Sequence, residues 1–165
     1  MPKKGKILTI SLVVLLIAGP TWAGGSFYGA TPGALSVIRG KLTEYPTPTK
    51  RSAPRRMATA LDGMIWFTEY GVNKIGRLDP KTGAMKEWDA PSKNSGPYAI
   101  NVDAGGVVWF SEFDANTVAR FDPKTEKFTV YPIPSRNAGV RKMTIDPEGR
   151  VWYLGNGSNT LGVVE

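Results

Sequence analysis

The chain contains no cysteine and no histidine among its 165 residues. Without cysteine it cannot form disulfides, so its stability has to come from a packed apolar core. Without histidine it lacks the side chain that most often serves as a general base near neutral pH. It also has no segment with the apolar periodicity of a helix, which excludes helical and leucine-rich repeats.

Long hydrophobic runs are scarce, and the longest lies near the N-terminus. Three lysines among the first six residues precede the apolar run 7–18, a break at Gly19-Pro20 and a small residue, Ala23. This order predicts a secretory signal peptide at 1–23, cleaved near Ala23, and a periplasmic or secreted protein. An uncleaved anchor is the alternative, but about twelve apolar residues are too few to span a bilayer, which takes about twenty. We therefore expect no stable membrane anchor.

Acidic residues are fewer than basic ones, 14 against 21, which gives a formal charge of +7. Removal of the three leader lysines lowers this charge to about +4. A mildly basic, exported chain with no feature typical of nucleic-acid recognition predicts no nucleic-acid partner. The next segment, 24–34, is rich in Gly, Ser, Thr and Pro, and we expect it to be a flexible lead-in.

A repeat of 43 residues organises the rest of the chain, as the spacing of Trp66, Trp109 and Trp152 shows. Each tryptophan has a glycine three positions before it, a β-branched residue one before it and an asparagine seven after it. A unit this short cannot bury its own apolar face and must stack against its neighbours. We expect the tryptophans to pack between neighbouring units rather than to bind a ligand.

Each repeat contains short segments of strand character, separated by turn residues. First strands are expected at Met57–Leu61, Ala99–Asp103 and Met143–Asp146. Second strands, which carry the tryptophans, are expected at Met64–Glu69, Val107–Glu112 and Arg150–Leu154. Third and fourth strands are expected at Lys74–Leu78, Thr117–Phe121 and Thr160–Val164, then at Met85–Trp88 and Phe128–Tyr131. Four antiparallel strands per unit predict an all-β fold made of β-propeller blades.

The turn residues support this strand assignment. The repeated asparagine tolerates left-handed backbone angles, which suits a tight turn after the second strand. Asp79-Pro80 opens the following turn, and Gly83 supplies the positive φ that closes it. Glu126 replaces this glycine in the second repeat, so we expect about 1 kcal/mol of strain there if the angle is kept.

The strands at 35–165 amount to about three blades, including a fourth-strand-like segment at 35–45. Closed propellers have about four to eight blades, so these residues predict a partial β-propeller with an incomplete ring. Two explanations stay open. The sequence is a piece of a longer propeller, or copies self-associate, most simply as two chains that close one ring. In the second case the strand at 35–45 would complete the last blade of a partner.

Two copies of a longer motif resemble the blade of the virginiamycin B lyase (streptogramin lyase) family. The first copy runs through 65–69 (IWFTE) and 73–80 (NKIGRLDP), and the second runs from 108–112 (VWFSE) to Asp122-Pro123. The resemblance implies a seven-bladed propeller and magnesium-dependent linearisation of a cyclic depsipeptide antibiotic by elimination at an ester bond. It also implies a histidine base near the start of an innermost strand and glutamates that hold the metal.

Part of this motif is absent from the chain. The glutamate position matches in Glu69 and Glu112, but the family's Pro-His pair is replaced by Pro54-Arg55, Pro97-Tyr98 and Val140-Arg141. An arginine stays charged and cannot accept a proton near neutral pH. We therefore expect a binding protein for a ligand or partner. The alternatives are a magnesium-dependent C–O lyase that takes its missing residues from another chain or a lost segment, and a structural interaction scaffold.

The predicted binding site lies on the rim where first strands begin and second strands end. The side chains expected there are Arg55, Arg56, Tyr98, Arg141 and Lys142, with Glu69 and Glu112. Guanidinium groups beside an aromatic ring predict a pocket for a polar or anionic small molecule or peptide. The alternative is that the arginines pair with the glutamates between blades.

Glu69 and Glu112 are also the candidate metal ligands. Equivalent carboxylates from neighbouring blades would approach the same axis and could hold Mg²⁺ or Ca²⁺ with water in the other positions. The alternative is an ion pair with Arg55 or Arg141, or simple solvation of the strand ends.

Overall fold

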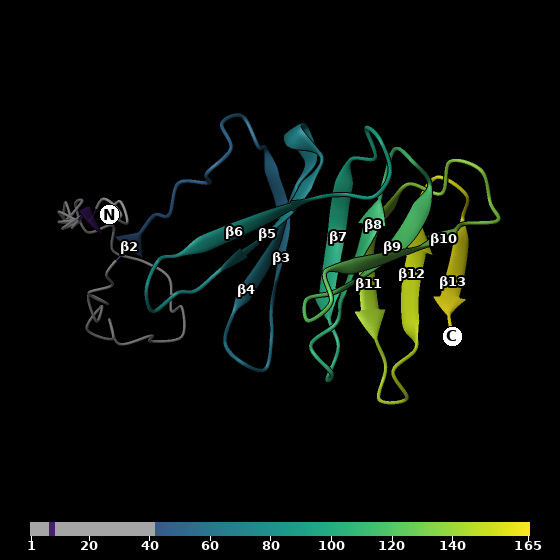
Figure 1. Ribbon diagram of the computed structural model, residues 1–165. Coiled ribbons are helices and arrows are strands. Elements are labelled where there is room, and N and C mark those ends of the chain that lie inside the picture. The colour runs from purple at the N-terminus through teal and green to yellow at the C-terminus, as the bar shows by residue number, and fades with distance from the viewer. Residues whose placement is uncertain (1–6, 9–41) are drawn as a thin grey trace, which may run out of the picture. The chain divides into compact units, whose positions relative to one another are not determined.

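Antiparallel strands make up nearly all the regular structure in the part of the chain that the computed structural model describes, residues 7–8 and 42–165 (Figure 1). One turn of 3-10 helix, η1 (Tyr70–Val72), is the only helical element in those residues. None of the described segments is a helix of the length and apolarity that a membrane crossing requires. The predicted all-β class is confirmed.

Strands β1 (Ile7–Leu8) and β2 (Leu42–Thr43) form a small antiparallel sheet with Ile7 opposite Thr43. They belong to a unit that ends at Tyr45, whereas the larger unit spans Pro46–Glu165. The predicted signal peptide and flexible lead-in lie outside the described residues, apart from β1. Of the strand expected at 35–45, the described part is confined to β2, so its role in completing a blade stays a prediction.

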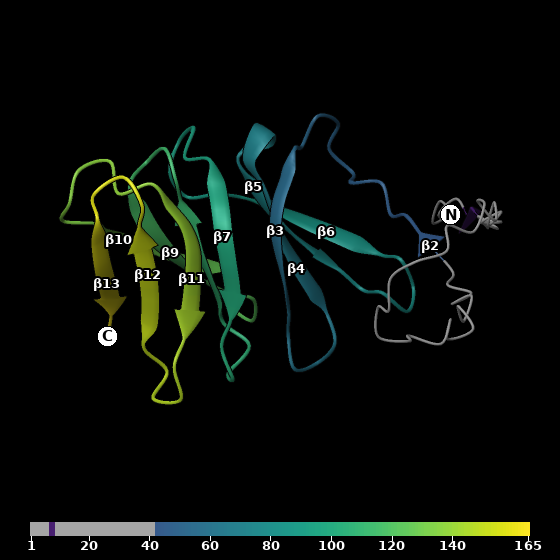
Figure 2. The ribbon, with the colours of Figure 1, turned by 180° about the vertical axis from the view of Figure 1, so that it is seen from behind.

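The larger unit contains three antiparallel sheets, each with its strands in chain order. The first blade comprises β3 (Pro54–Thr59), β4 (Ile65–Glu69), β5 (Lys74–Leu78) and β6 (Met85–Asp89). The second comprises β7 (Pro97–Val102), β8 (Val108–Glu112), β9 (Thr117–Asp122) and β10 (Lys127–Pro132). The third comprises β11 (Val140–Ile145), β12 (Val151–Gly155) and β13 (Thr160–Val164). First strands β3, β7 and β11 stand side by side, as the innermost strands of propeller blades do (Figure 2).

The apolar core lies between the blades and not within them. One buried cluster joins Trp66 and Ile75 of the first blade to Phe110 and Phe121 of the second. A second cluster joins the second blade to the third, with Trp109 on one side and Val151 on the other. The prediction that Trp66 and Trp109 pack between blades is therefore confirmed, since each blade needs its neighbour to cover its apolar face.

Turn geometry agrees with the repeated residues. Asn73, Asn116 and Asn159 have left-handed φ angles of 59°, 58° and 54°. The Asn73 side chain also fixes the connection to the next blade, because its Oδ1 accepts hydrogen bonds from the backbone N and the hydroxyl of Ser95 at 2.7 and 2.8 Å. Glu126 keeps a positive φ of 56° where the first blade has Gly83, so the expected strained angle is present.

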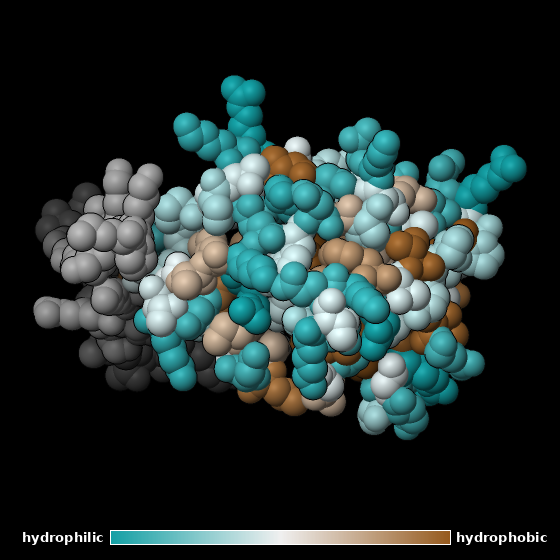
Figure 3. Space-filling view, viewed as in Figure 1, coloured by the Kyte–Doolittle hydropathy of each residue, from teal (hydrophilic) through white to brown (hydrophobic). Residues whose placement is uncertain are grey.

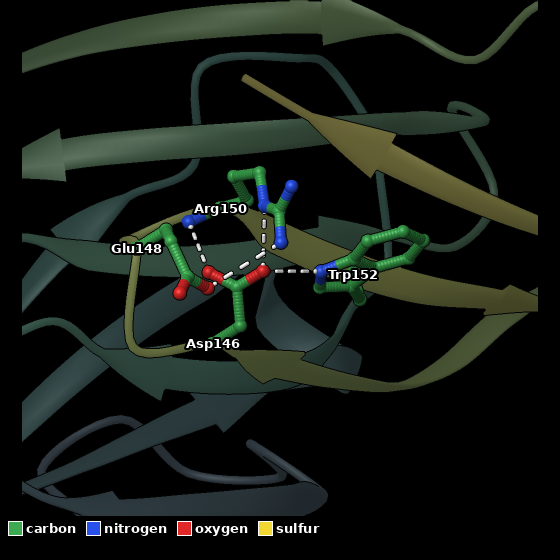
Figure 4. A network of polar contacts seen from close by, with 4 residues as sticks. All are labelled: Asp146, Glu148, Arg150 and Trp152. Carbon is green, nitrogen blue, oxygen red and sulfur yellow. Dashed lines mark hydrogen bonds and ion pairs between the residues drawn. The ribbon is translucent and has the colours of Figure 1, made fainter.

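A carboxylate holds the turn between β11 and β12 and the tryptophan that follows it (Figure 4). Asp146 accepts hydrogen bonds from the indole Nε1 of Trp152 at 2.7 Å and from Nε of Arg150 at 2.7 Å. Burial raises the pKa of the Asp146 carboxyl, but these hydrogen bonds outweigh burial and lower the pKa to about 2. Asp103 binds Trp109 in the same way at 3.1 Å, so this contact recurs in two blades.

Candidate arginine–aromatic site

A β-bulge interrupts the start of every innermost strand. In each blade the first residue of the innermost strand pairs with the last residue of the second strand: Pro54 with Glu69, Pro97 with Glu112 and Val140 with Gly155. The register then shifts before pairing resumes at Met57, Ile100 and Met143. A β-bulge changes the direction in which side chains point. The three bulges contain Arg55, Tyr98 and Arg141, the residues that the sequence predicts on the rim.

Arginines of the first blade stack on tyrosines of the same rim. The guanidinium carbon of Arg55 lies 4.9 Å from the ring centre of Tyr70 and 5.7 Å from that of Tyr98. Arg56 lies over the Tyr98 ring at 5.1 Å. Tyr98 comes from β7, so the first-blade arginines reach across to the second blade.

The stacking continues towards the third blade. The rings of Tyr98 and Phe113 have their centres 5.5 Å apart, and Arg141 of β11 lies over the Phe113 ring at 5.4 Å. We define the arginine–aromatic row as the side chains along this rim that stack in sequence: Arg55, Arg56, Tyr70, Tyr98, Phe113 and Arg141. Tyr70 and Phe113 were not predicted as site residues, although both directly follow the repeated glutamate.

The arginines of the row keep their charge available to a ligand. Arg55, Arg56 and Arg141 are exposed, while the aromatic rings beneath them are half-buried. Across residues 42–165, no salt bridge joins these arginines to Glu69 or Glu112, so the alternative of arginine–glutamate pairs is not what the structure shows. Stacking on a ring leaves the N–H edge of a guanidinium free to bind a carboxylate or phosphate with two hydrogen bonds.

A hollow of about 390 Å³ lies beside the row, between the loops of the first and second blades. It is lined by Tyr70, Asn73, Asn94, Gly96 and Asp114, with Gly71 and Val72. A hydrogen bond to Asp114 raises the pKa of the Tyr70 hydroxyl. Gly96 has a positive φ of 59°, and a Cβ there would lie 2.4 Å from Asp114 and 2.7 Å from the Tyr70 ring. A side chain at Gly96 would therefore be strained and would crowd Asp114 and the Tyr70 ring.

The two predicted glutamates are buried and do not face the row. Glu112 closes a loop of its own blade: it accepts hydrogen bonds from the backbone N and hydroxyl of Ser92 at 3.1 and 2.7 Å and from the hydroxyl of Thr117 at 2.6 Å. Its carboxylate oxygens are thus already occupied by donors from the second blade and the loop before it.

Glu69 has the same repeat position but a different environment. Among the described residues, neither of its buried oxygens has a hydrogen-bond partner of good geometry. Thr49, which corresponds to Ser92, donates instead to the Glu87 carboxylate at 3.0 and 2.6 Å. Burial, and then the negative charge of Glu87, raise the pKa of Glu69 to about 7.

The surroundings of Glu69 and Glu112 can be compared with those that a shared magnesium site would need. Glu69 has Glu87, Ser52 and Lys74 as its electrostatic neighbours, and Glu112 has Ser92 and Thr117 as its donors. Throughout the described part of the chain, no three acidic side chains gather in a way that could hold a metal ion. A metal site shared by Glu69 and Glu112 stays a prediction, and no chemistry is assigned to it.

Four-stranded antiparallel sheets set side by side along their first strands define a β-propeller. The WD40 β-propeller domain of Doa1 matches with a TM-score of 0.57 over 67% of this chain and 36% of that chain, at 16% identity, a likeness of fold alone. The model of the virginiamycin B lyase family matches residues 32–165, so the chain belongs to the virginiamycin B lyase family.

Solved structures of the family agree with this assignment. Virginiamycin B lyase from Staphylococcus aureus is 28% identical, with a TM-score of 0.70 over 77% of this chain and 42% of that chain. A catalytically inactive form of that enzyme, solved with quinupristin, matches at 28% identity and a TM-score of 0.70, over 78% of this chain and 43% of that one. The chain therefore spans less than half the length of these relatives.

Proposed function

We propose that this protein is an exported β-propeller that binds an anionic small molecule or peptide at the arginine–aromatic row. The observation that carries the proposal is the stacking of Arg55 and Arg141 on rings of the neighbouring blade or loop. Each ring fixes a guanidinium plane without neutralising it, so an incoming carboxylate meets an oriented donor pair. The signal-peptide pattern of residues 1–23 supports export.

Binding is a better function for this row than catalysis by the chain alone. The chain has no histidine, and the exposed side chains along the row are permanently charged arginines. The one carboxyl with a pKa of about 7, Glu69, is buried and cannot touch a ligand on the rim. A purely structural scaffold is less well supported, because such a scaffold has no need of oriented, unpaired guanidinium groups.

A second candidate is lyase activity on a cyclic depsipeptide with Mg²⁺. It is favoured by family membership and by the likeness to a relative solved with quinupristin. Incubation of the protein with quinupristin and Mg²⁺, followed by mass spectrometry, separates the two functions. A linearised product would support the lyase, and intact quinupristin would leave binding as the function.

The binding proposal is tested by titrating the isotope-labelled protein with benzoate and with triglutamate while recording NMR shifts. We expect both probes to shift resonances of the row, and Arg55→Gln and Arg141→Gln each to weaken binding about tenfold, since each removes a charge-assisted donor pair. Lys81→Gln is the matched control, because it removes the same charge from a turn on the opposite rim. The proposal would be refuted if neither probe bound the protein, or if Lys81→Gln weakened binding as much as the two arginine variants.

A further inference from the structure

A carboxylate without an ion pair lies beside the arginine–aromatic row, in the loop that follows β8. Asp114 lines the hollow between the loops of the first and second blades, and it is exposed. None of the salt bridges in residues 42–165 includes it. Of the described residues that line the hollow it is the one acid, whereas the charged side chains of the row are arginines. This rim therefore offers charges of both signs to a ligand.

Contacts on two sides hold the Asp114 carboxylate in place. It accepts a hydrogen bond from the hydroxyl of Tyr70, which lies in η1 of the first blade. One of its oxygens lies over Gly96, where a Cβ would stand 2.4 Å away. The backbone N of Asp114 also donates to the carbonyl of Ser95 at 2.8 Å. A carboxylate fixed in this way keeps its direction when a ligand arrives.

The next junction between blades shows that the fold does not require this pair of side chains. One repeat after Tyr70 the chain has Phe113, and one repeat after Asp114 it has Gly157. The glycine in the wall of the hollow has a φ of 59° at the first junction and 60° at the second, so the backbone is alike. The second junction thus forms without the hydroxyl and without the carboxylate. At the first junction these two groups are available for recognition.

One aromatic ring positions both the positive and the negative group. The guanidinium carbon of Arg55 lies 4.9 Å from the ring centre of Tyr70, and the hydroxyl of the same ring is bonded to Asp114. An O–H···O hydrogen bond is only about 2.7 Å long, so the two charges are close enough for one small ligand to reach both. Two charged contacts made by one ligand reinforce each other, because the second forms without a further loss of translational freedom.

We propose that the ligand of this rim is a small zwitterion, whose carboxylate binds Arg55 and whose ammonium group binds Asp114 in the hollow. This assignment rests on the proposed function, because the row has to hold the anionic end of the ligand. The hollow of about 390 Å³ has room for an amine and the atoms next to it. Hydrophilic side chains project from the edge at which η1 and the start of β7 lie (Figure 3, in the orientation of Figure 1). An amino acid or a short peptide with a free amino group has this chemistry.

An amine suits the hollow better than a divalent metal ion does. Ca²⁺ and Mg²⁺ take about six or more oxygen ligands, with several carboxylates among them in protein sites. Among the described residues no three acidic side chains gather for such a site. An ammonium group has three N–H donors. The hollow offers it the Asp114 carboxylate, the Tyr70 oxygen and the exposed amide of Asn94 as acceptors.

The test compares two probes of nearly the same shape, 4-(aminomethyl)benzoate and 4-ethylbenzoate, in NMR titrations of the isotope-labelled protein at neutral pH. Both probes carry a carboxylate, and only the first carries an ammonium group. We expect the ammonium probe to bind about tenfold more tightly, because it adds a charge-assisted contact. We also expect it to shift the backbone amide resonances of Asn94 and Gly96 more than 4-ethylbenzoate does.

Asp114→Asn is the decisive variant, because it keeps the shape of the side chain and removes its charge. We expect it to abolish the preference for the ammonium probe and to leave the binding of 4-ethylbenzoate, which needs only the arginines, unchanged. Asp62→Asn is the matched control, since it removes the same charge from an exposed turn between β3 and β4 and should leave the preference intact. The NMR spectrum of each variant without probe shows whether the fold is kept.

The outcomes separate this inference from the proposed function. Equal affinities of the wild type for the two probes, or a preference that survives Asp114→Asn, would overturn the inference, while binding of 4-ethylbenzoate would still support the proposed function. A preference that Asp62→Asn also removed would show a general effect of charge and would overturn the inference as well. If neither probe bound, the proposed function would fail and this inference with it.

Discussion

Glu69 and Glu112 occupy the same repeat position in neighbouring blades, but their carboxyl groups have different environments. Both are the last residue of a second strand and both are buried. Glu112 accepts three hydrogen bonds, from the backbone N and hydroxyl of Ser92 and from the hydroxyl of Thr117. Glu69 lacks such donors, because Thr49 donates to Glu87 instead, and burial and then the charge of Glu87 raise the pKa of Glu69 to about 7. The difference arises because Val130 of the second blade is replaced by Glu87 in the first.

This environment predicts that Glu69 destabilises the protein at alkaline pH. Its folded pKa of about 7 lies above its ordinary value of 4.5, so the folded state binds more protons between these values. Stability should therefore fall as pH rises through that range. We expect Glu69→Gln, which is never charged, to remove this loss and to be more stable than the wild type by about 2 kcal/mol near pH 8. Urea denaturation near pH 5 and pH 8 measures the effect.

Glu112→Gln is the control at the equivalent position and should have the opposite sign. Its amide nitrogen cannot accept the hydrogen bonds of Ser92 or Thr117, so we expect a loss of about 1 kcal/mol. If the two glutamine variants changed stability in the same direction, the different environments assigned to Glu69 and Glu112 would be wrong.

At the level of strands, an aromatic ring in the second strand lies over a small residue in the third. Phe67 pairs with Gly76, Phe110 with Ala119, and Tyr153 with Gly162. A Cβ at Gly162 would lie 2.0 Å from the Tyr153 ring, and one at Gly76 would lie 2.2 Å from the Phe67 ring. The glycines are needed here for close approach and not for a special backbone angle.

We therefore expect Gly162→Ala to destabilise the protein by about 1 to 3 kcal/mol, because the ring must leave its packed position. Tyr153 is buried in the core between the second and third blades, so the shift would disturb that junction. Thermal unfolding followed by circular dichroism measures the cost. Ala119→Gly is the comparison: it frees the backbone and removes one buried methyl group but leaves the ring in place, so we expect a loss of about 1 to 2 kcal/mol without displacement of the ring. A neutral Gly162→Ala variant would contradict the expectation.

Most strand positions could be predicted from the repeat, and the exceptions have a common cause. The third strands were predicted at Lys74–Leu78 and Thr160–Val164, as observed. The first strands begin two or three residues earlier than predicted, at Pro54, Pro97 and Val140. The β-bulges at these starts break the alternation of apolar and polar residues on which the prediction depended.

In the molecule as a whole, the blades should unfold together, because both buried clusters lie between sheets. Phe121 lies in one of these clusters, with ring centres 5.1 Å from Trp88 and 4.6 Å from Phe128. We expect Phe121→Ala to cost about 3 to 5 kcal/mol and to shift a single transition seen alike by tryptophan fluorescence and circular dichroism. Separate transitions for separate blades would show that the junctions are weaker than the sheets.

The candidate site was predictable only in part. Arg55, Tyr98 and Arg141 were placed on one rim by their shared repeat position, and the structure joins them in the arginine–aromatic row. Tyr70 and Phe113 were missed, because repeated aromatics are more often core residues than site residues. Their contribution depends on loops that bring them under arginines of other strands.

The sequence by itself determined the repeat, the strand order and the turns, because these depend on residues close together in the chain. A tryptophan, a glycine or an asparagine at a fixed interval imposes the same local conformation each time. Only the tertiary structure decided which of three equivalent residues is covered, as with exposed Leu161 and buried Ile75. It also decided that burial and the charge of Glu87 raise the pKa of Glu69. The burial and the pKa of a side chain depend on neighbours that come from distant segments of the chain. A local sequence pattern does not show which side chains those neighbours are.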